Sequence, residues 1–143
     1  GLGDVYKRQV HLHLFNSCGE LYLQKRPAWK DIQPGRWDTA VGGHVDWGEE
    51  PLAALRREVR EEVGVTDFEP QHVLTYLFES ERERELVYVY KTVYDGPVVP
   101  SGELDGGRFW TLREIAEGVG GGIFTPNFEG EIRRVAELPD VGR

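Results

Sequence analysis

Residues 43–65 read GHVDWGEEPLAALRREVREEVGV, and this stretch carries the strongest structural signal in the chain. Residues 51–63 predict an α-helix, because Pro51 suits the first helical turn and Gly64 suits a left-handed stop. Apolar side chains recur at the helical period along one stripe, which consists of Leu52, Leu55, Val59 and Val63. We therefore expect this helix to pack one face against a core.

Three glutamates occupy a second face of the same helix. Glu58, Glu61 and Glu62 are spaced i, i+3 and i+4, so their carboxylates lie side by side. Each neighbouring like-charge pair destabilises a helix by about 0.2–0.5 kcal/mol unless a cation offsets the repulsion. Hard divalent cations prefer carboxylate oxygens, so this face is either a solvated surface or a site for Mg²⁺ or Mn²⁺. Arg57 is placed to pair with Glu49 and to hold the preceding loop against the helix.

The spacing of the whole stretch favours the second of these alternatives. It consists of Gly, five residues, Glu, seven residues, Arg-Glu-aliphatic, one residue, Glu-Glu, one residue and Gly-aliphatic. Every specified position is filled, by Gly43, Glu49, Arg57, Glu58, Val59, Glu61, Glu62, Gly64 and Val65. The chain therefore resembles the Nudix hydrolase superfamily, and the order of its expected elements resembles that family over residues 10–138. The resemblance implies an α/β fold, a Nudix-type α/β/α sandwich with a mixed β-sheet and a loop–helix–loop catalytic motif.

The resemblance also implies a reaction, the hydrolysis of a diphosphate linked to another group, with Mg²⁺ or Mn²⁺ as cofactor. The implied metal ligands are Glu58, Glu61, Glu62 and the backbone carbonyl of Gly43. Arg57 and Glu49 are implied as an orienting pair, and Glu62 is a catalytic candidate as well as a ligand. Metal ions suit this reaction, because they neutralise charge on phosphate oxygens and lower the pKa of a bound water. The substrate stays open between nucleoside diphosphates linked to another group and other organic diphosphates.

A general base is needed too, and the family takes it either from the motif or from a later loop. Glu79, Glu81, Glu83 and Glu85 alternate with other residues, so an extended segment would place them on one face. Glu79 and Glu81 are typical of an exposed, self-paired edge. Glu83 and Glu85 adjoin an apolar strand expected at residues 86–90, and we count both among the catalytic candidates.

The segment before the motif resembles type I isopentenyl diphosphate isomerases. That likeness is carried by residues 19–26 (GELYLQKR), Lys30, residues 34–38 (PGRWD) and residues 42–44 (GGH). His44 matches a histidine ligand of the isomerases, and Glu83 and Glu85 match their later Glu-x-Glu. Their acid–base cysteine is not matched, because Gly42 stands at that position and cannot move a proton. We expect hydrolase chemistry on an isomerase-like scaffold; the alternatives are an isomerase and a non-catalytic nucleotide-binding module.

Basic residues gather before the motif, at Lys25, Arg26, Lys30 and Arg36. They either bind an outer phosphate, which arginine can do bidentately, or form ordinary surface charge. Trp37 and Trp47 flank the Gly43 loop, where they either stack on a substrate ring or pack in the core. The substrate-binding candidates are Lys25, Arg26, Arg36, Trp37 and His44.

Three further residue types have structural interpretations. His11 and His13 alternate on an expected strand, and we interpret them as structural because no further ligand follows at metal-site spacing. Trp110 ends another expected strand and is assigned to the core. Cys18 lies in an expected turn, and a single cysteine excludes an internal disulfide.

Composition narrows the class of protein. The 143 residues fit one domain, and no apolar run approaches the ~20 residues of a membrane helix. The formal net charge of −8 argues against nonspecific nucleic-acid binding, because an acidic surface repels phosphate backbones. We expect a cytoplasmic protein with a small-molecule diphosphate as partner and a homodimer as an open alternative. Residues 1–9 (GLGDVYKRQ) read unlike the rest and are treated as a non-native leader, which leaves residues 10–143 as one domain.

Alternating and periodic apolar residues predict the remaining elements. Strands are expected at residues 10–15, 21–24, 38–41, 68–78, 85–94 and 108–110, and helices at 111–117 and 127–138. The mixture of hairpins and helices favours a mixed sheet covered by helices.

Overall fold

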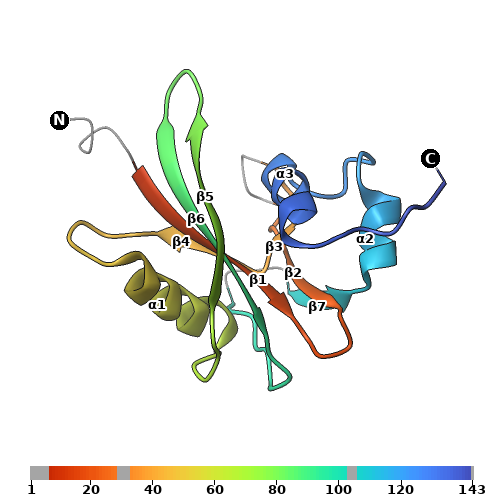
Figure 1. Ribbon diagram of the computed structural model, residues 1–143, viewed down its shortest axis with the longest axis horizontal. Coiled ribbons are helices and arrows are strands. Elements are labelled where there is room, and N and C mark those ends of the chain that lie inside the picture. The colour runs from red at the N-terminus through yellow and green to blue at the C-terminus, as the bar shows by residue number, and fades with distance from the viewer. Residues whose placement is uncertain (1–6, 29–32, 103–105, 143) are drawn as a thin grey trace.

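A mixed β-sheet lies between helices in the computed structural model, which describes residues 7–28, 33–102 and 106–142 (Figure 1). The strands are β1 (Lys7–Phe15), β2 (Leu21–Lys25), β3 (Trp37–Thr39), β4 (Val41–His44), β5 (Gln71–Glu79), β6 (Arg84–Val93) and β7 (Gly107–Trp110). The helices are α1 (Pro51–Val63), α2 (Leu112–Gly118) and α3 (Pro126–Val135). None of these three helices is long and apolar enough to cross a bilayer.

The strands run in the order β3-β2-β1-β6-β5, with β4 added to β1 and β7 added to β2. β1 is parallel to β6 over the whole length of β1, whereas the other pairings between these seven strands are antiparallel. The same edge of β1 pairs first with β4 and then, near its end, with β2. This pairing confirms the expected mixed sheet.

Alternation along β1 separates two layers of packing. Val10, Leu12 and Leu14 are fully buried and pack with α1, which contributes Leu55 and Val59 to the same cluster. The intervening side chains point to the opposite face, which α3 covers through the buried residues Phe128, Ile132 and Val135. Figure 1 shows α1 on one side of the strands and α3 with α2 on the other, as expected for an α/β/α sandwich.

Several boundaries differ from the sequence-based expectation. The strand expected at residues 38–41 is two strands, because the chain leaves β2 after Thr39 and joins β1 from Val41. The first strand begins at Lys7 rather than at residue 10, and pairs with β6 from its first residue. The strand expected from residue 68 begins only at Gln71, directly after Pro70, which has no N–H to donate to a ladder.

The helices also shift by a few residues. Thr111 caps α2 instead of joining it, since its hydroxyl accepts a hydrogen bond from the Glu114 N–H. α3 ends at Val135, because Ala136 is already extended. In α1, Leu52 is 43% exposed and Ala54 takes its place on the buried stripe.

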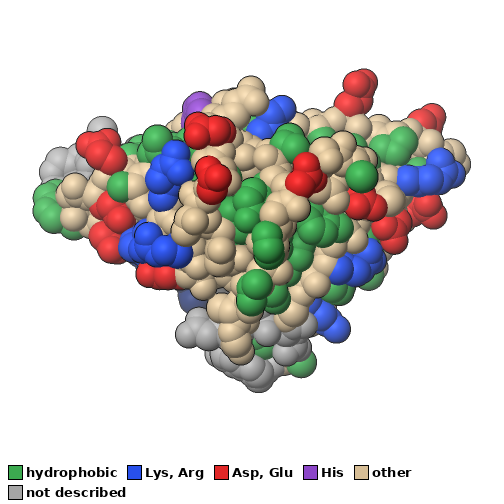
Figure 2. All heavy atoms as spheres, turned by 90° about the horizontal axis from the view of Figure 1, so that it is seen from below, with side chains coloured by type: hydrophobic (Ala, Val, Ile, Leu, Met, Phe, Trp, Pro, Cys, Tyr) green, Lys and Arg blue, Asp and Glu red, His purple; other side chains and the backbone are tan. Residues whose placement is uncertain are grey.

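Seen from below, apolar side chains lie near the middle of the surface and charged ones mostly toward its two sides (Figure 2).

Candidate functional site

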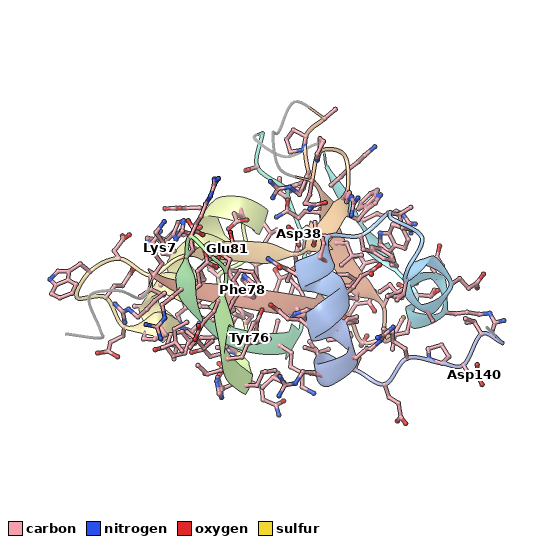
Figure 3. All side chains as sticks on the ribbon, turned by 90° about the horizontal axis from the view of Figure 1, so that it is seen from above. Lys7, Asp38, Tyr76, Phe78, Glu81 and Asp140 are labelled. Carbon is pink, nitrogen blue, oxygen red and sulfur yellow. The ribbon has the colours of Figure 1, made fainter. Side chains whose placement is uncertain are left out.

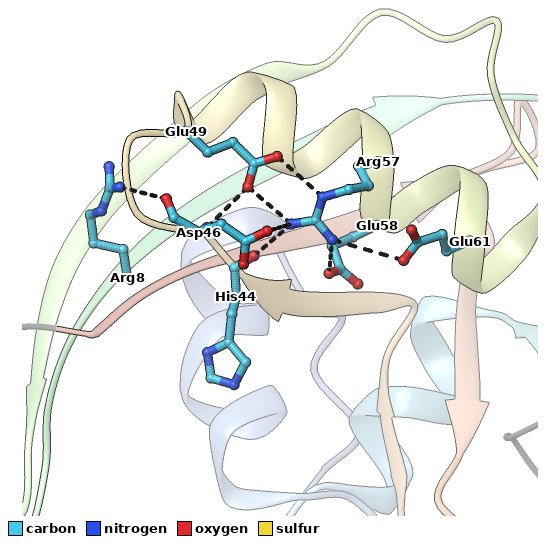
Figure 4. A network of polar contacts seen from close by, with 7 residues as sticks. All are labelled: Arg8, His44, Asp46, Glu49, Arg57, Glu58 and Glu61. Atoms are coloured by element: carbon cyan, nitrogen blue, oxygen red, sulfur yellow. Dashed lines mark hydrogen bonds and ion pairs between the residues drawn. The ribbon is translucent and has the colours of Figure 1, made fainter.

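A network around Arg57 joins α1 to the loop before it (Figure 4). The guanidinium donates to both carboxylate oxygens of Glu49, at 3.1 and 3.0 Å, and to the backbone carbonyl of His44 at 3.0 Å. It also donates to Glu58 at 2.7 Å. The hydrogen bond from Arg57 holds the pKa of the Glu49 carboxyl below its usual range. The expected contact between Arg57 and Glu49 is therefore present, and it fixes the end of β4 relative to the helix.

Glu58 and Glu62 lie together where α1 packs against β4. A Cβ at Gly43 would overlap the Glu58 carboxyl group, so only glycine admits this close approach. The backbone N–H of Gly42 donates to Glu62, and Glu62 shares a hydrogen bond with Glu58. Burial, followed by that hydrogen bond and the charge of Glu58, raises the pKa of Glu62 to about 9.

One oxygen of Glu62, Oε2, is buried and has no hydrogen-bond partner among the described residues. A buried acceptor without a donor is costly, and a carboxyl pair with such an oxygen suits a hard divalent cation. Glu61 is different, because its side chain is 57% exposed and lies 3.8 Å from Arg57. Within the described ranges no three His, Cys, Asp or Glu side chains already form a metal site. The structure thus brings two of the three expected carboxylates together, and both fit a cation.

The later glutamates form a second carboxyl pair. Glu83 and Glu85 share a hydrogen bond, and Lys7 donates to Glu83 at 2.9 Å. That hydrogen bond from Lys7 lowers the pKa of Glu83, whereas burial raises the pKa of Glu85. His44 lies close enough to act electrostatically on both carboxyls. His44, Glu83 and Glu85, which follow Gly42 in the chain and match residues of the isomerases, therefore lie close together in the structure.

Glu79 and Glu81 lie outside this pair. Glu79 contacts Arg84 at 3.7 Å, and Glu81 is exposed in the turn between β5 and β6. This arrangement agrees with the exposed, self-paired edge expected from the sequence.

The basic candidates have different surroundings. Arg26 lines a cavity of about 200 Å³ beside Gly42, and its guanidinium lies 3.7 Å from Asp38. The guanidinium of Arg36 instead approaches the backbone carbonyl of Phe124 at 3.4 Å. Lys25 is half-buried at the end of β2, and Lys30 lies outside the described residues. Arg26 is thus the basic candidate that the structure brings to the cavity.

Of the tryptophans considered above, Trp37 and Trp110 pack together, whereas Trp47 is exposed. Trp37 packs edge-on against Trp110, with ring centroids 5.2 Å apart, in the core cluster that α2 and α3 cover. Trp110 is 6% exposed, as expected for a core residue. Trp47 is 91% exposed, so it neither packs in the core nor meets another described ring. Trp37 is only partly buried where it packs against this core, and its grouping with the substrate-binding residues stays a prediction.

The other face of the sheet carries a buried polar network that includes His11 and His13. Glu131 of α3 is 3% exposed and lies 2.6 Å from Nδ1 of His11 and 2.9 Å from Nε2 of His13. The hydroxyl of Tyr76 donates to Glu131 at 2.5 Å. Figure 3 places Tyr76 alongside α3 and Asp38 at the start of that helix, where Asp38 accepts a hydrogen bond from Thr125. Both histidines therefore contact a buried carboxylate of α3.

Comparison with known proteins identifies the family. A model of the NUDIX domain matches residues 5–128. The chain belongs to the Nudix family. An uncharacterized Nudix hydrolase of Pseudomonas aeruginosa, PA4841, is 35% identical over 103 residues, which are 71% of this chain and 61% of that protein. The chain thus spans about three fifths of the length of this relative.

Two further comparisons bear on the branch and the fold. Isopentenyl-diphosphate Delta-isomerase of Serratia proteamaculans is 30% identical over 131 residues, covering 81% of this chain and 72% of that enzyme. The crystal structure of DR0079 from Deinococcus radiodurans superposes with a TM-score of 0.78 at 26% identity, over 90% of this chain and 82% of that one. These matches confirm the Nudix fold and the likeness to the isomerase branch.

Sequence reasoning missed the residues that surround His11 and His13, above all Glu131, because these residues lie outside the Nudix box. Glu131 occupies the buried face of α3, three residues after Phe128 and four before Val135. An acidic residue on an apolar stripe requires a buried partner, so this periodicity was the available signal. Asp38 and Tyr76 carried no comparable signal, because only the folded chain brings them to α3.

Proposed function

We propose that this Nudix chain is a metal-dependent hydrolase that cleaves a diphosphate linkage by attack of water at phosphorus. The observation that carries the proposal is the Glu58–Glu62 pair, whose unpartnered buried oxygen lies on a helix with a complete box. A structural role explains this pair poorly, since two adjacent carboxyls with an unsatisfied oxygen destabilise a fold. A cation-binding role explains the proximity, the burial and the missing donor together.

Glu58 and Glu62 would hold the cation, with the carbonyl of Gly43 and with Glu61 from the same helix. Mg²⁺ or Mn²⁺ bound there would neutralise diphosphate charge and lower the pKa of a bound water. Arg57 orients Glu58 and holds the loop through Glu49. These contacts fix the Glu58 carboxylate and the loop relative to the helix, which limits the reorganisation needed during the reaction.

The proton of the attacking water has two candidate acceptors in the proposal. Glu62 lies within the box, and Glu85 belongs to the second carboxyl pair, where burial raises its pKa. Replacing Glu85 by glutamine separates the candidates. A base at Glu85 predicts that kcat falls by about 10²-fold while Mg²⁺ affinity stays unchanged. Unchanged kcat would assign the proton to Glu62.

The test measures phosphate or monophosphate release from a panel of organic diphosphates with Mg²⁺ or Mn²⁺. The variants Glu58→Gln and Glu62→Gln should abolish release, and EDTA should do the same to the parent chain. Glu50→Gln is the matched control, because Glu50 is the residue directly before the same helix and its exposed side chain makes no capping hydrogen bond. Release that persists in EDTA or in both glutamine variants would refute the proposal.

A second candidate function is isopentenyl diphosphate isomerisation. It is favoured by the identity to the Serratia enzyme and by the proximity of His44 to Glu83 and Glu85. Gly42 opposes it, since no side chain at that position can donate or accept a proton. The panel therefore includes isopentenyl diphosphate, and formation of dimethylallyl diphosphate without phosphate release would favour the isomerase. Metal-dependent binding without turnover of any member would favour a non-catalytic module.

A further inference from the structure

The buried network of Glu131 joins three elements, β1, β5 and α3, and none of its side chains belongs to the Nudix box. Its carboxylate accepts from Tyr76 on β5 and lies within hydrogen-bond distance of His11 and His13 on β1. Such a charge is stable in an interior only when its oxygens are fully engaged, and here both are. The network therefore fixes the orientation of each histidine ring.

The two histidines differ in what their rings reach. His13 is fully buried and its ring stacks on Phe128, so it serves the interior alone. The side chain of His11 is 12% exposed and lines the cavity of about 200 Å³ that also contains Arg26. Asp38 adds a carboxylate to the same cavity, 3.7 Å from the Arg26 guanidinium. The other polar side chains of the cavity are Gln9, Gln24, Thr39 and Asn127. The cavity is thus lined mainly by hydrogen-bonding groups, with Arg26 as its basic member.

Gly42 opens this cavity toward His11. A Cβ built at Gly42 would lie 3.4 Å from Cδ2 of His11 and 3.8 Å from Nε2, so a larger side chain would cover this edge of the ring. The N–H of Gly42 donates to Glu62, which belongs to the proposed cation site. One residue of β4 therefore separates the Nε2 edge of His11 from the carboxyl pair.

We propose that His11 binds a phosphate oxygen of the substrate through Nε2, with Glu131 holding the ring by Nδ1. This inference rests on the proposed function, because it supplies a second anchor for the same diphosphate. A ring held at Nδ1 by a carboxylate can present Nε2 in only one direction, and Gly42, which lies beside that edge of the ring, lines the same cavity.

The charge of the surroundings supports this role. Burial acts to lower the pKa of His11, but the hydrogen bond and charge of Glu131 outweigh it, and Asp38 and Glu85 add to the same effect. The pKa of His11 is therefore raised, and a protonated ring carries a hydrogen on Nε2 as well as on Nδ1. Charge-assisted donors of this kind bind phosphate oxygens strongly.

The test measures binding of methylenediphosphonate, a diphosphate analogue that water cannot cleave, to the full chain by calorimetry with Mg²⁺ present. His11→Asn keeps an amide donor near the position of Nδ1 for Glu131 and removes the group at Nε2. We expect its dissociation constant to rise roughly tenfold or more. His13→Gln is the matched control, since it alters the same Glu131 network without reaching the cavity, and its dissociation constant should stay within twofold.

Gly42→Val provides an independent variant that leaves both histidines in place. Its side chain should cover the Nε2 edge and weaken binding of the analogue as His11→Asn does, while thermal unfolding stays cooperative.

Unchanged affinity in His11→Asn, equal losses in His13→Gln, or no binding by the parent chain would overturn the inference. Binding that depends on His11 without turnover of any diphosphate would reject the proposed hydrolysis instead. Turnover with an unchanged KM in His11→Asn would reject only the role of His11.

Discussion

Replacing Glu131 by glutamine tests how the polar network contributes to stability. The carboxylate is 3% exposed and is shared by two histidines and a tyrosine. Glutamine keeps nearly the same shape but removes the charge, and its amide group can accept through one oxygen only. At least one of the three partners then either faces the amide nitrogen of glutamine, which is a donor, or loses its hydrogen bond.

The magnitude follows from burial. Breaking a buried charged pair by changing one partner lowers the free energy of unfolding by about 3–5 kcal/mol. Because glutamine keeps one acceptor oxygen, we expect a loss of about 3 kcal/mol for Glu131→Gln. For a chain of this length each kcal/mol lowers the Tm by about 2–4 °C, so a fall of about 6–12 °C is expected. Urea unfolding should show a lower midpoint at an unchanged slope.

The pH dependence gives a sharper test, because the two partners act in opposite directions. Burial acts to raise the pKa of Glu131, but hydrogen bonds from His11 and His13 and their charge hold it well below its usual range. Its stabilising effect is therefore present above about pH 4.3 and is lost as the pH falls. The pKa of His11 is raised, so its effect is present below about pH 6.5 and is lost as the pH rises through the folded-state value.

The stability difference between the parent chain and Glu131→Gln should consequently be greatest between about pH 4.5 and 6.5. The assay is urea unfolding followed by tryptophan fluorescence at intervals from pH 3 to 9. Glu137→Gln is the control, because it makes the same change on an exposed residue just beyond α3. A difference below about 1 kcal/mol at every pH, or one equal to that of the control, would refute a charged network at Glu131.

Three further outcomes are expected around the box. Glu62→Gln should stabilise the metal-free chain by about 1 kcal/mol near pH 8, because the raised pKa of Glu62 means that the unfolded state ionises more readily. Thermal unfolding in EDTA should show this gain disappearing below about pH 4.3. Gly43→Ala should weaken Mg²⁺ binding, measured by calorimetry, at least about tenfold through overlap with the facing carboxyl, whereas Gly130→Ala, with open space around it, should not. Arg57→Lys keeps the charge but loses the paired contact with Glu49, so kcat/KM should fall about tenfold or more in steady-state assays, and an unchanged value would contradict its orienting role.

Local signals predicted the elements that depend on local geometry. The helix at residues 51–63 has the bounds of α1, because a proline start, a glycine stop and an apolar stripe all act within one segment. The contact between Arg57 and Glu49 and the proximity of Glu58 to Glu62 were also predictable, since loop and helix spacing set them.

Pairing between distant strands was less predictable. The division between β3 and β4 arises because two different strands, β2 and β1, supply the hydrogen-bond partners on either side of Ala40. Nothing within residues 38–41 encodes that change of partner. The orientation of the Glu61 side chain was hard to predict for a similar reason. Helical spacing places Glu61 on the same face as Glu58, but it does not show that solvent and the Arg57 guanidinium lie beside Glu61.

The cavity residues show why the box alone gave an incomplete account of the site. His11 and Glu131 are 120 residues apart and belong to different layers, so neither periodicity nor motif spacing relates them. Each nevertheless departs from its local pattern, His11 as a polar residue in a central strand and Glu131 as a charge on a buried helix face. A buried charge requires a partner of opposite charge or a set of donors, and few such residues point into this interior. Two unmatched polar residues on facing layers are therefore evidence for one another, and Gly42 leaves the edge of the His11 ring uncovered beside the cavity.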